Sequence, residues 1–133
     1  MAETRSLFQW TEAYSVDDPE IDRQHKKLFG YADDLHRAML SGTGKQILER
    51  LLANLVAYTR EHFSHEEQLM ARIGYPDRDA HVREHVELTR QVTEFQQRFA
   101  CGQVAMTVEI SQFLSQWLKH HISTVDRRLC AQQ

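Results

Sequence analysis

The segment LERLLANLVAYTREHFSHEEQLMARI, residues 48–73, decides the fold of this chain. Its apolar residues recur at helical spacing, from Leu48 through Leu55, and this periodicity predicts an amphipathic helix. His62 and Glu66 are four residues apart and continue the same stripe, so both side chains face the interior of the protein. Because a buried carboxylate needs partners, the remaining segments have to supply them.

Three other segments show the same helical periodicity, and turn signals separate all four. Asp18 followed by Pro19 is typical of a helix start, and Asp77 is placed to cap a later helix. Glycine-containing breaks lie at residues 41–44, 74–76 and 101–102. The short connections predict an all-α fold, an antiparallel up-down-up-down four-helix bundle. We interpret residues 1–133 as one domain.

The first 18 residues precede the predicted bundle and form an N-terminal arm. The arm contains apolar and aromatic side chains at Leu7, Phe8, Trp10, Tyr14 and Val16. Free tails are poor in such residues. We therefore expect residues 1–18 to pack on the bundle instead of extending into solvent.

Composition excludes several classes of protein. The 133 residues hold 16 Lys and Arg against 19 Asp and Glu, a net charge of −3, so no basic surplus is present to bind nucleic acid. The longest apolar run, residues 55–58, is too short to cross a membrane, and no signal peptide is visible. Cys101 and Cys130 alone do not form a disulfide framework. We expect a cytoplasmic protein.

Five of the eight histidines, together with two carboxylates, occupy inward-facing helical positions. These residues are His25, His62, Glu66, His81, His85, His121 and Asp126. They fall near the starts of the first and third helices and the ends of the second and fourth, which meet at one end of such a bundle. Asp126 follows His121 by five residues, or about 140° on an α-helix, so we expect it to reach in from the side.

A layer of seven such side chains is stable only if each has a partner, because lone buried polar groups and ions are costly. Imidazole and carboxylate together suit first-row transition metals such as iron, zinc, copper or nickel. Seven ligands are too many for one ion and suit two. The layer holds no cysteine, which argues against a structural zinc site or an iron–sulfur cluster.

The other three histidines are His36, His65 and His120. We interpret them as non-ligands, because their helical neighbours are polar or their position lies too far along the helix axis. His65 and Glu66 begin the pattern of a zinc protease, but Leu69 stands where a second histidine is required. The Glu-x-x-His pattern of ferritin-type di-iron proteins does not occur. Glu67, beside a candidate ligand, is interpreted as solvated.

Four stretches of this sequence resemble the motifs of the hemerythrin family, especially the single-domain bacteriohemerythrins. They are IDRQHKKL at residues 21–28, HFSHEEQLM at 62–70, Tyr75-Pro76 leading to His81 and His85, and WLKHHI at 117–122 continuing to Asp126. The resemblance covers nearly the whole chain, with all seven candidate ligands in order. One position departs mildly, because Leu88 stands where many members carry an aromatic residue.

This resemblance implies a non-haem di-iron centre that binds O₂ reversibly, with an oxo or hydroxo group as an additional bridge. The implied ligands are His81, His85 and His121 for one iron, His25 and His62 for the other, and Glu66 and Asp126 as bridges. The iron with two histidines would keep a position open for O₂. The residues that resemble the family's O₂ pocket are Leu28, Phe63, Trp117, Leu118 and Ile122.

Two functions of different classes use such a centre. We expect an O₂-binding protein for storage, delivery or scavenging, not an enzyme, because the ligands leave one open position and no polar residues mark a substrate pocket. The alternative is a di-iron oxidoreductase or a redox- or nitric-oxide-responsive module. A third interpretation is a zinc or iron store. We expect a monomer, served by a redox partner protein.

Overall fold

The computed structural model describes residues 8–103, 105 and 108–132, without the side chains of residues 108 and 109. Regular structure in these residues is entirely helical. The elements are η1 (Glu12–Tyr14), α1 (Pro19–Leu40), α2 (Lys45–Ile73), α3 (Arg78–Ala100), α4 (Val108–His120), η2 (His121–Asp126) and α5 (Arg127–Cys130). None of the described helices combines the length and apolar character of a membrane-spanning segment.

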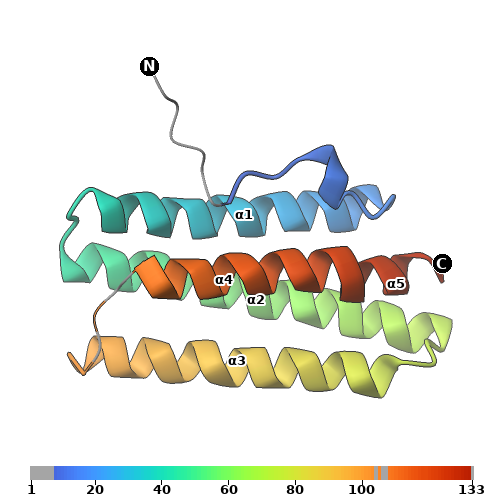
Figure 1. Cartoon of the computed structure of the whole chain (residues 1–133). Coiled ribbons are helices and arrows are strands. Elements are labelled where there is room, and N and C mark those ends of the chain that lie inside the picture. The colour runs from blue at the N-terminus through green and yellow to red at the C-terminus, as the bar shows by residue number, and fades with distance from the viewer. Residues whose placement is uncertain (1–7, 104, 106–107, 133) are drawn as a thin grey trace.

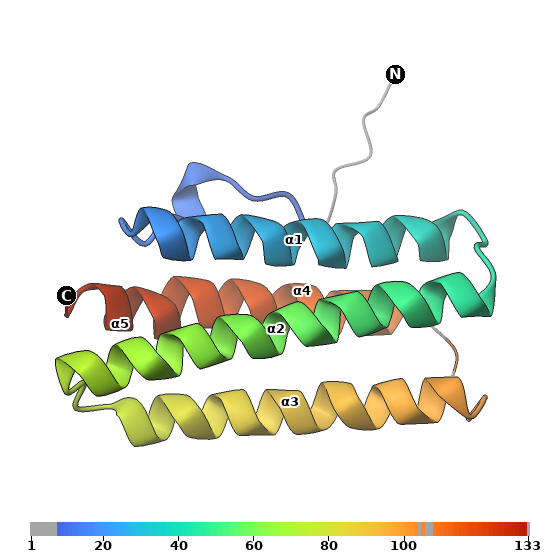
Figure 2. The same ribbon diagram turned by 180° about the vertical axis from the view of Figure 1, so that it is seen from behind.

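The long helices alternate in direction and form an up-down-up-down bundle, in which η2 and α5 continue α4 (Figure 1). α4 passes in front of α2 in Figure 1 and behind it in Figure 2, while α1 and α3 lie on either side in both views. The starts of α1 and α3 therefore lie at the same end of the molecule as the ends of α2 and α5. The predicted fold class is confirmed.

Local sequence signals set the helix boundaries, with one exception. The Asp18 carboxylate accepts hydrogen bonds from the backbone N–H groups of Glu20 and Ile21, and a proline occupies the first turn of α1. Gly74 ends α2 in the left-handed region, at a φ of 65°, which favours glycine. Asp77 lies directly before α3, but its side chain makes no capping hydrogen bond.

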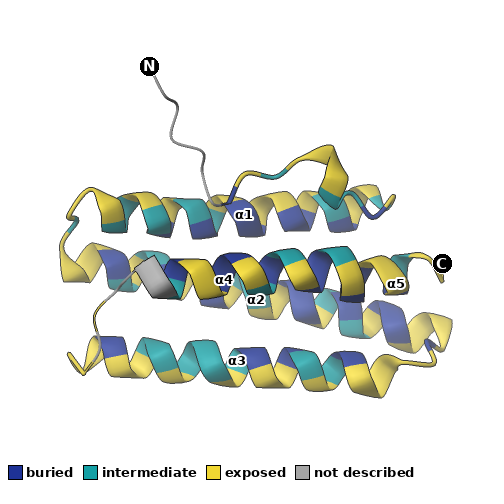
Figure 3. Ribbon diagram, in the orientation of Figure 1, coloured by how far each residue is buried: buried dark blue, intermediate teal, exposed yellow. Residues whose placement is uncertain are grey.

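Two apolar clusters fill the bundle, and buried residues line the inner faces of the helices (Figure 3). The larger cluster includes Leu28 of α1, Leu55 of α2 and Ile122 of η2. The smaller cluster includes Ile21 at the start of α1 and Leu129 of α5. Buried polar residues lie between these positions in the helices, so a polar layer is enclosed by apolar packing on two sides.

The described part of the N-terminal arm packs along the bundle. Phe8 is 3% exposed within the larger cluster, and Trp10 packs against that cluster. Arg127 donates a hydrogen bond of 2.8 Å to the backbone carbonyl of Ala13, which ties the arm to α5. The first seven arm residues, including Leu7, lie outside the described residues.

Replacing the capping side chain tests the start of α1. Asp18→Ala removes the acceptor for two backbone N–H groups, so we expect the free energy of unfolding to fall by about 1 kcal/mol. Asp77→Ala is the matched control, because that carboxylate caps nothing, and its effect should stay under about 0.5 kcal/mol. Urea denaturation measures both variants. Equal losses would contradict the capping role.

Candidate metal centre

All seven predicted polar residues lie in one buried layer, with exposed fractions from 0% to 2%. The contributing residues are His25 of α1, His62 and Glu66 of α2, His81 and His85 of α3, and His121 and Asp126 of η2. In all five histidines the ring nitrogen Nε2 faces the two carboxylates. The layer therefore joins polar atoms from four parts of the bundle at one end.

Asp126 divides its two oxygens between two groups of histidines. Oδ2 lies 2.8 Å from Nε2 of His25 and 3.3 Å from Nε2 of His62. Oδ1 lies 3.2 Å from Nε2 of His81 and 2.9 Å from Nε2 of His121. A carboxylate with one oxygen directed toward each group has the geometry of a bridge between two sites.

Glu66 is the second carboxylate of the layer and faces the same histidines from α2. Its Oε1 lies 3.1 Å from Nε2 of His85 and 3.5 Å from Nε2 of His62. The same oxygen lies 3.6 Å from Nε2 of His81 and of His121. Glu66 therefore also contacts histidines from both groups.

The fourth helix of the bundle widens where it crosses the layer. Residues His121–Asp126 form a π-helical turn, in which hydrogen bonds join residues five apart instead of four. The wider turn brings Asp126 back toward the face that carries His121, and its carboxylate is fully buried. The expectation that Asp126 reaches the layer from the side of a regular α-helix is wrong, because the backbone changes its hydrogen-bond register between His121 and Asp126.

The candidate ligand atoms form two compact groups. One group contains Glu66, His81, His85, His121 and Asp126, and the other contains His25, His62, Glu66 and Asp126. Within each group the atoms lie within 4.8 Å of one another. Both carboxylates belong to both groups. Nitrogen and oxygen donors of this kind suit first-row transition metals.

Several atoms of the layer lack a hydrogen bond although they are buried and close to other polar atoms. They include both carboxylate oxygens of Glu66, Oδ1 of Asp126 and Nε2 of His81. Nε2 of His85 also lies 3.3 Å from Nε2 of His121, so two ring nitrogens face each other. Buried polar atoms normally have partners, and cations between these atoms would satisfy them. The donor set therefore fits metal ions.

Comparison with known proteins identifies the family. The family model described as the hemerythrin HHE cation binding domain matches residues 17–132. The chain belongs to the hemerythrin family. A bacteriohemerythrin of Methylococcus capsulatus is 32% identical over 123 residues, which cover 92% of this chain and 93% of that protein. A bacteriohemerythrin of Stenotrophomonas maltophilia is 33% identical over 122 residues, which cover 92% and 78%.

Solved hemerythrin structures share the fold of this family member. The crystal structure of a wild-type hemerythrin matches with a TM-score of 0.84 at 31% identity, over 90% of this chain and 92% of that one. A single-residue variant of a hemerythrin matches with a TM-score of 0.89 at 29% identity, over 96% and 98%. The prediction of a hemerythrin-like four-helix bundle is confirmed.

Two imidazoles of this hemerythrin layer have partners on their outer nitrogen, Nδ1. Nδ1 of His62 lies 2.7 Å from Oε1 of Gln24, which is buried. Nδ1 of His85 lies 3.1 Å from Oε2 of Glu67, whose side chain is 36% exposed. The interpretation of Glu67 as simply solvated is wrong. Gln24 is not among the residues predicted for the site, and the one signal for it in the sequence is its place directly before His25.

The five residues predicted to line an O₂ pocket surround the layer in different ways. Phe63 stacks on His85 at a ring-centroid distance of 3.7 Å. Trp117 stacks on His121 at 4.8 Å. The other three are buried in the larger apolar cluster, namely Leu28, Leu118 and Ile122. Aromatic rings therefore hold two of the imidazoles in place, and aliphatic side chains close the layer on one side.

A small apolar cavity lies about one helical turn from the layer. Its volume is about 10 Å³, and its lining includes two of the predicted pocket residues, Trp117 and Leu118. Thr59 and Leu88 also line it, although neither is among the residues predicted for the O₂ pocket. The Thr59 hydroxyl donates to the backbone carbonyl of Leu55, so its polar group is already satisfied. The cavity has room for about one water-sized molecule.

The three histidines predicted to be non-ligands belong to neither group in the described residues. His36 meets the ring of Phe8 edge-on, with ring centroids 5.8 Å apart. His65 lines a polar hollow on the surface between α1 and α2. His120 is exposed. Each of these side chains therefore has surroundings unlike those of the polar layer.

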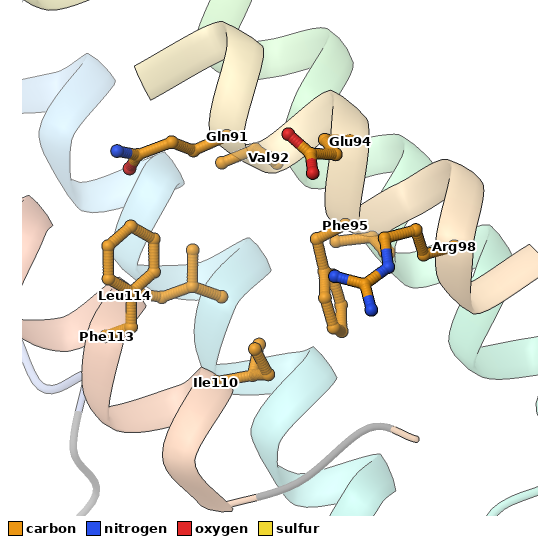
Figure 4. Close-up of a pocket in the computed structure, with 9 residues that line it drawn as sticks. Gln91, Val92, Glu94, Phe95, Arg98, Ile110, Phe113 and Leu114 are labelled. Carbon is orange, nitrogen blue, oxygen red and sulfur yellow. The ribbon is translucent and has the colours of Figure 1, made fainter. Parts of the chain in front are cut away.

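A larger apolar hollow lies away from the layer, between α3 and α4 (Figure 4). Its volume is about 310 Å³, and Phe95, Ile110 and Phe113 are among its lining residues. Ile110 precedes His121 by 11 residues, which is about 16 Å along a helix. This hollow is therefore separate from the candidate metal centre.

Mutual contacts shift the pKa values of the layer. Burial alone would lower the pKa of His121, but the negative charges of the adjacent Asp126 and Glu66 carboxylates raise it to about 10. The same carboxylates outweigh burial for His81 and raise its pKa to about 9. Burial and the charge of Asp126 would raise the pKa of Glu66, but His62 and two further histidines lower it to about 2. Without metal, the layer therefore holds protonated histidines beside ionised carboxylates.

The stability of the metal-free protein should depend on pH in a defined direction. His81 and His121 bind protons more tightly in the folded state, so their contribution is full below pH 6.5 and is lost as the pH rises through 9 to 10. Glu66 has the opposite sign, because its contribution is present above pH 4.5 and is lost as the pH falls toward 2. Thermal melting of chelator-treated protein measures both. A melting temperature that rises from about pH 6.5 to 10 would contradict this pairing.

Proposed function

We propose that this chain binds O₂ reversibly at a non-haem di-iron centre, for oxygen storage, delivery or scavenging. The proposed ligands are His81, His85 and His121 for one iron, His25 and His62 for the other, and Glu66 and Asp126 for both. When bound, two ferrous ions supply the electrons and the open coordination position that O₂ binding requires. The protein supplies the ligands, their orientation and a closed apolar surrounding.

One observation carries this proposal, namely that Asp126 directs one oxygen toward each group of histidines. Oδ2 faces His25 and His62, and Oδ1 faces His81 and His121. This division suits two cations that share a carboxylate. A single four-coordinate structural ion would use fewer donors and would leave the rest unpaired. The arrangement therefore supports a two-metal centre.

The space around the layer favours binding of a small gas over turnover of a larger substrate. The adjacent apolar cavity measures about 10 Å³, whereas typical ligand pockets measure about 300–1,000 Å³. The predicted pocket residues would exclude water and protons from the bound gas, and such an apolar surrounding controls solvent access to a metal. They are Leu28, Phe63, Trp117, Leu118 and Ile122. We therefore propose a binding protein, not an enzyme.

The proposal also covers the oligomeric state, the compartment and the partner of the protein. We propose one hemerythrin domain that acts as a monomer in the cytoplasm. Because an oxidised centre has to be reduced before it binds O₂ again, we include a redox partner protein. The proposal includes neither a nucleic-acid partner nor insertion into a membrane; the net charge of −3 supports the first of these, because the chain has no basic surplus.

Visible spectroscopy of the iron-loaded protein tests the proposed function. Anaerobically reduced protein, with its iron counted per chain, is exposed to air and then deoxygenated. We expect two irons per chain and an absorption band that appears in air and disappears when O₂ is removed. Oxidation without a reversible band would contradict O₂ carriage and favour the oxidoreductase or redox-responsive alternative.

A pair of histidine variants tests the ligand assignment. His62→Ala removes one of the two histidines of the smaller group, so we expect the reversible band to disappear while circular dichroism still reports a helical bundle. His65→Ala is the matched control on the same helix, because His65 belongs to neither group and its variant should keep the band. A His62→Ala protein that holds two irons and keeps the reversible band would refute the assignment.

A further inference from the structure

Two proposed ligands have outer partners that differ in charge. Nδ1 of His62 faces the Gln24 amide, whereas Nδ1 of His85 faces the Glu67 carboxylate. Among the described residues, Nδ1 has no hydrogen-bond partner in the other three, which are His25, His81 and His121. We call the group with His81, His85 and His121 the three-histidine half of the centre, and the group with His25 and His62 the two-histidine half. Each half therefore contains one imidazole with an outer partner, which is the Glu67 carboxylate in the three-histidine half and the Gln24 amide in the two-histidine half.

Gln24 sets the direction of its hydrogen bond to His62. Its Nε2 donates to Oε1 of Glu20 at 3.1 Å, and a carboxylate oxygen can only accept. The amide oxygen of Gln24 therefore faces His62, so Nδ1 of His62 has to donate. In a neutral imidazole, Nε2 then carries the lone pair and faces the layer. Gln24 thus holds His62 in the tautomer that a metal ligand requires.

Glu67 imposes the same tautomer on His85 and adds a negative charge. Its carboxylate can only accept, so Nδ1 of His85 donates at 3.1 Å. Nε2 of the same ring lies 3.1 Å from Oε1 of Glu66, inside the layer. A carboxylate on the outer nitrogen raises the basicity of a ligating imidazole. Gln24 is neutral and cannot add this effect to His62.

We propose that Gln24 and Glu67 are positioning residues that tune the two halves of the centre unequally. The Glu67 carboxylate strengthens metal binding by the three-histidine half, whereas the Gln24 amide orients His62 without strengthening it. This inference rests on the proposed function and extends it to the order in which the two halves take up metal. The half that contains His85 fills first, and Glu67 sets part of the difference in affinity.

Zinc titration of the metal-free protein measures the two halves without oxygen chemistry. Competition with a chelating dye should resolve two binding steps in the wild type. Glu67→Gln keeps a hydrogen-bond acceptor and removes the charge, so the tighter step should weaken by about 10–100-fold while the looser step stays unchanged. Glu61→Gln is the matched control, because it removes an exposed carboxylate of α2 that is not among the candidate ligands.

Moving a carboxylate along α1 tests the half that contains His62, where the affinity for zinc should rise instead of fall. The double variant Glu20→Gln/Gln24→Glu moves one carboxylate from residue 20 to residue 24 and leaves the net charge unchanged. The looser zinc step should tighten by about 10-fold, because His62 gains a charged outer partner. This variant changes the half that Glu67 does not contact, so it decides the inference even if Glu67→Gln fails to fold.

Proton NMR of the zinc-loaded protein adds a measurement that does not depend on affinity. The Nδ1–H protons of His62 and His85 should exchange slowly with water, and Gln24→Leu should remove the His62 signal alone. Equal effects of Glu67→Gln and Glu61→Gln on the zinc steps would overturn the tuning inference and leave the proposed function standing. Fewer than two zinc ions per wild-type chain would instead overturn the two-metal function and the inference with it.

Discussion

The carboxylate of Asp126 has to lie between two groups of histidines, and the rest of the bundle depends on this constraint. The side chain is fully buried, and its oxygens lie within 3.3 Å of imidazole nitrogens from α1, α2, α3 and η2. A charge in such a place is stable only when several partners approach it together. The helices therefore meet with their polar positions at one level, and the π-helical turn is the backbone adjustment that accompanies this meeting.

Apolar packing and charge pairing act on the same helices in different layers. The two apolar clusters supply the favourable free energy of burial, while the polar layer costs desolvation that only mutual pairing offsets. In the metal-free protein, protons on His81 and His121 take the place of cations, which is why their pKa values rise to about 9 and about 10. Metal uptake at the proposed centre therefore has to displace protons, so that affinity and folding are coupled through pH.

Much of the architecture could be predicted because it depends on periodicity. His25, His62 and His121 lie on apolar stripes, and short connections between helices place all three at one end. The π-helical turn could not be predicted, because apolar periodicity reports which face is buried and not the hydrogen-bond register of the backbone. The contact of Glu67 with His85 escaped for another reason, since it joins α2 to α3 and no spacing within one helix reports it.

The π-helical turn also has a consequence for how changes in chain length are tolerated. A π-helical turn contains one residue more than the α-helical turn that it replaces. Removing a residue between His121 and Asp126 would leave a four-residue spacing, which ordinary α-helical winding already places on one face. The same deletion elsewhere in the helix would rotate every later side chain by about 100°. An alignment gap of one residue at this turn is therefore compatible with an intact centre, whereas a gap between His81 and His85 of α3 would turn the two ligands away from a common face.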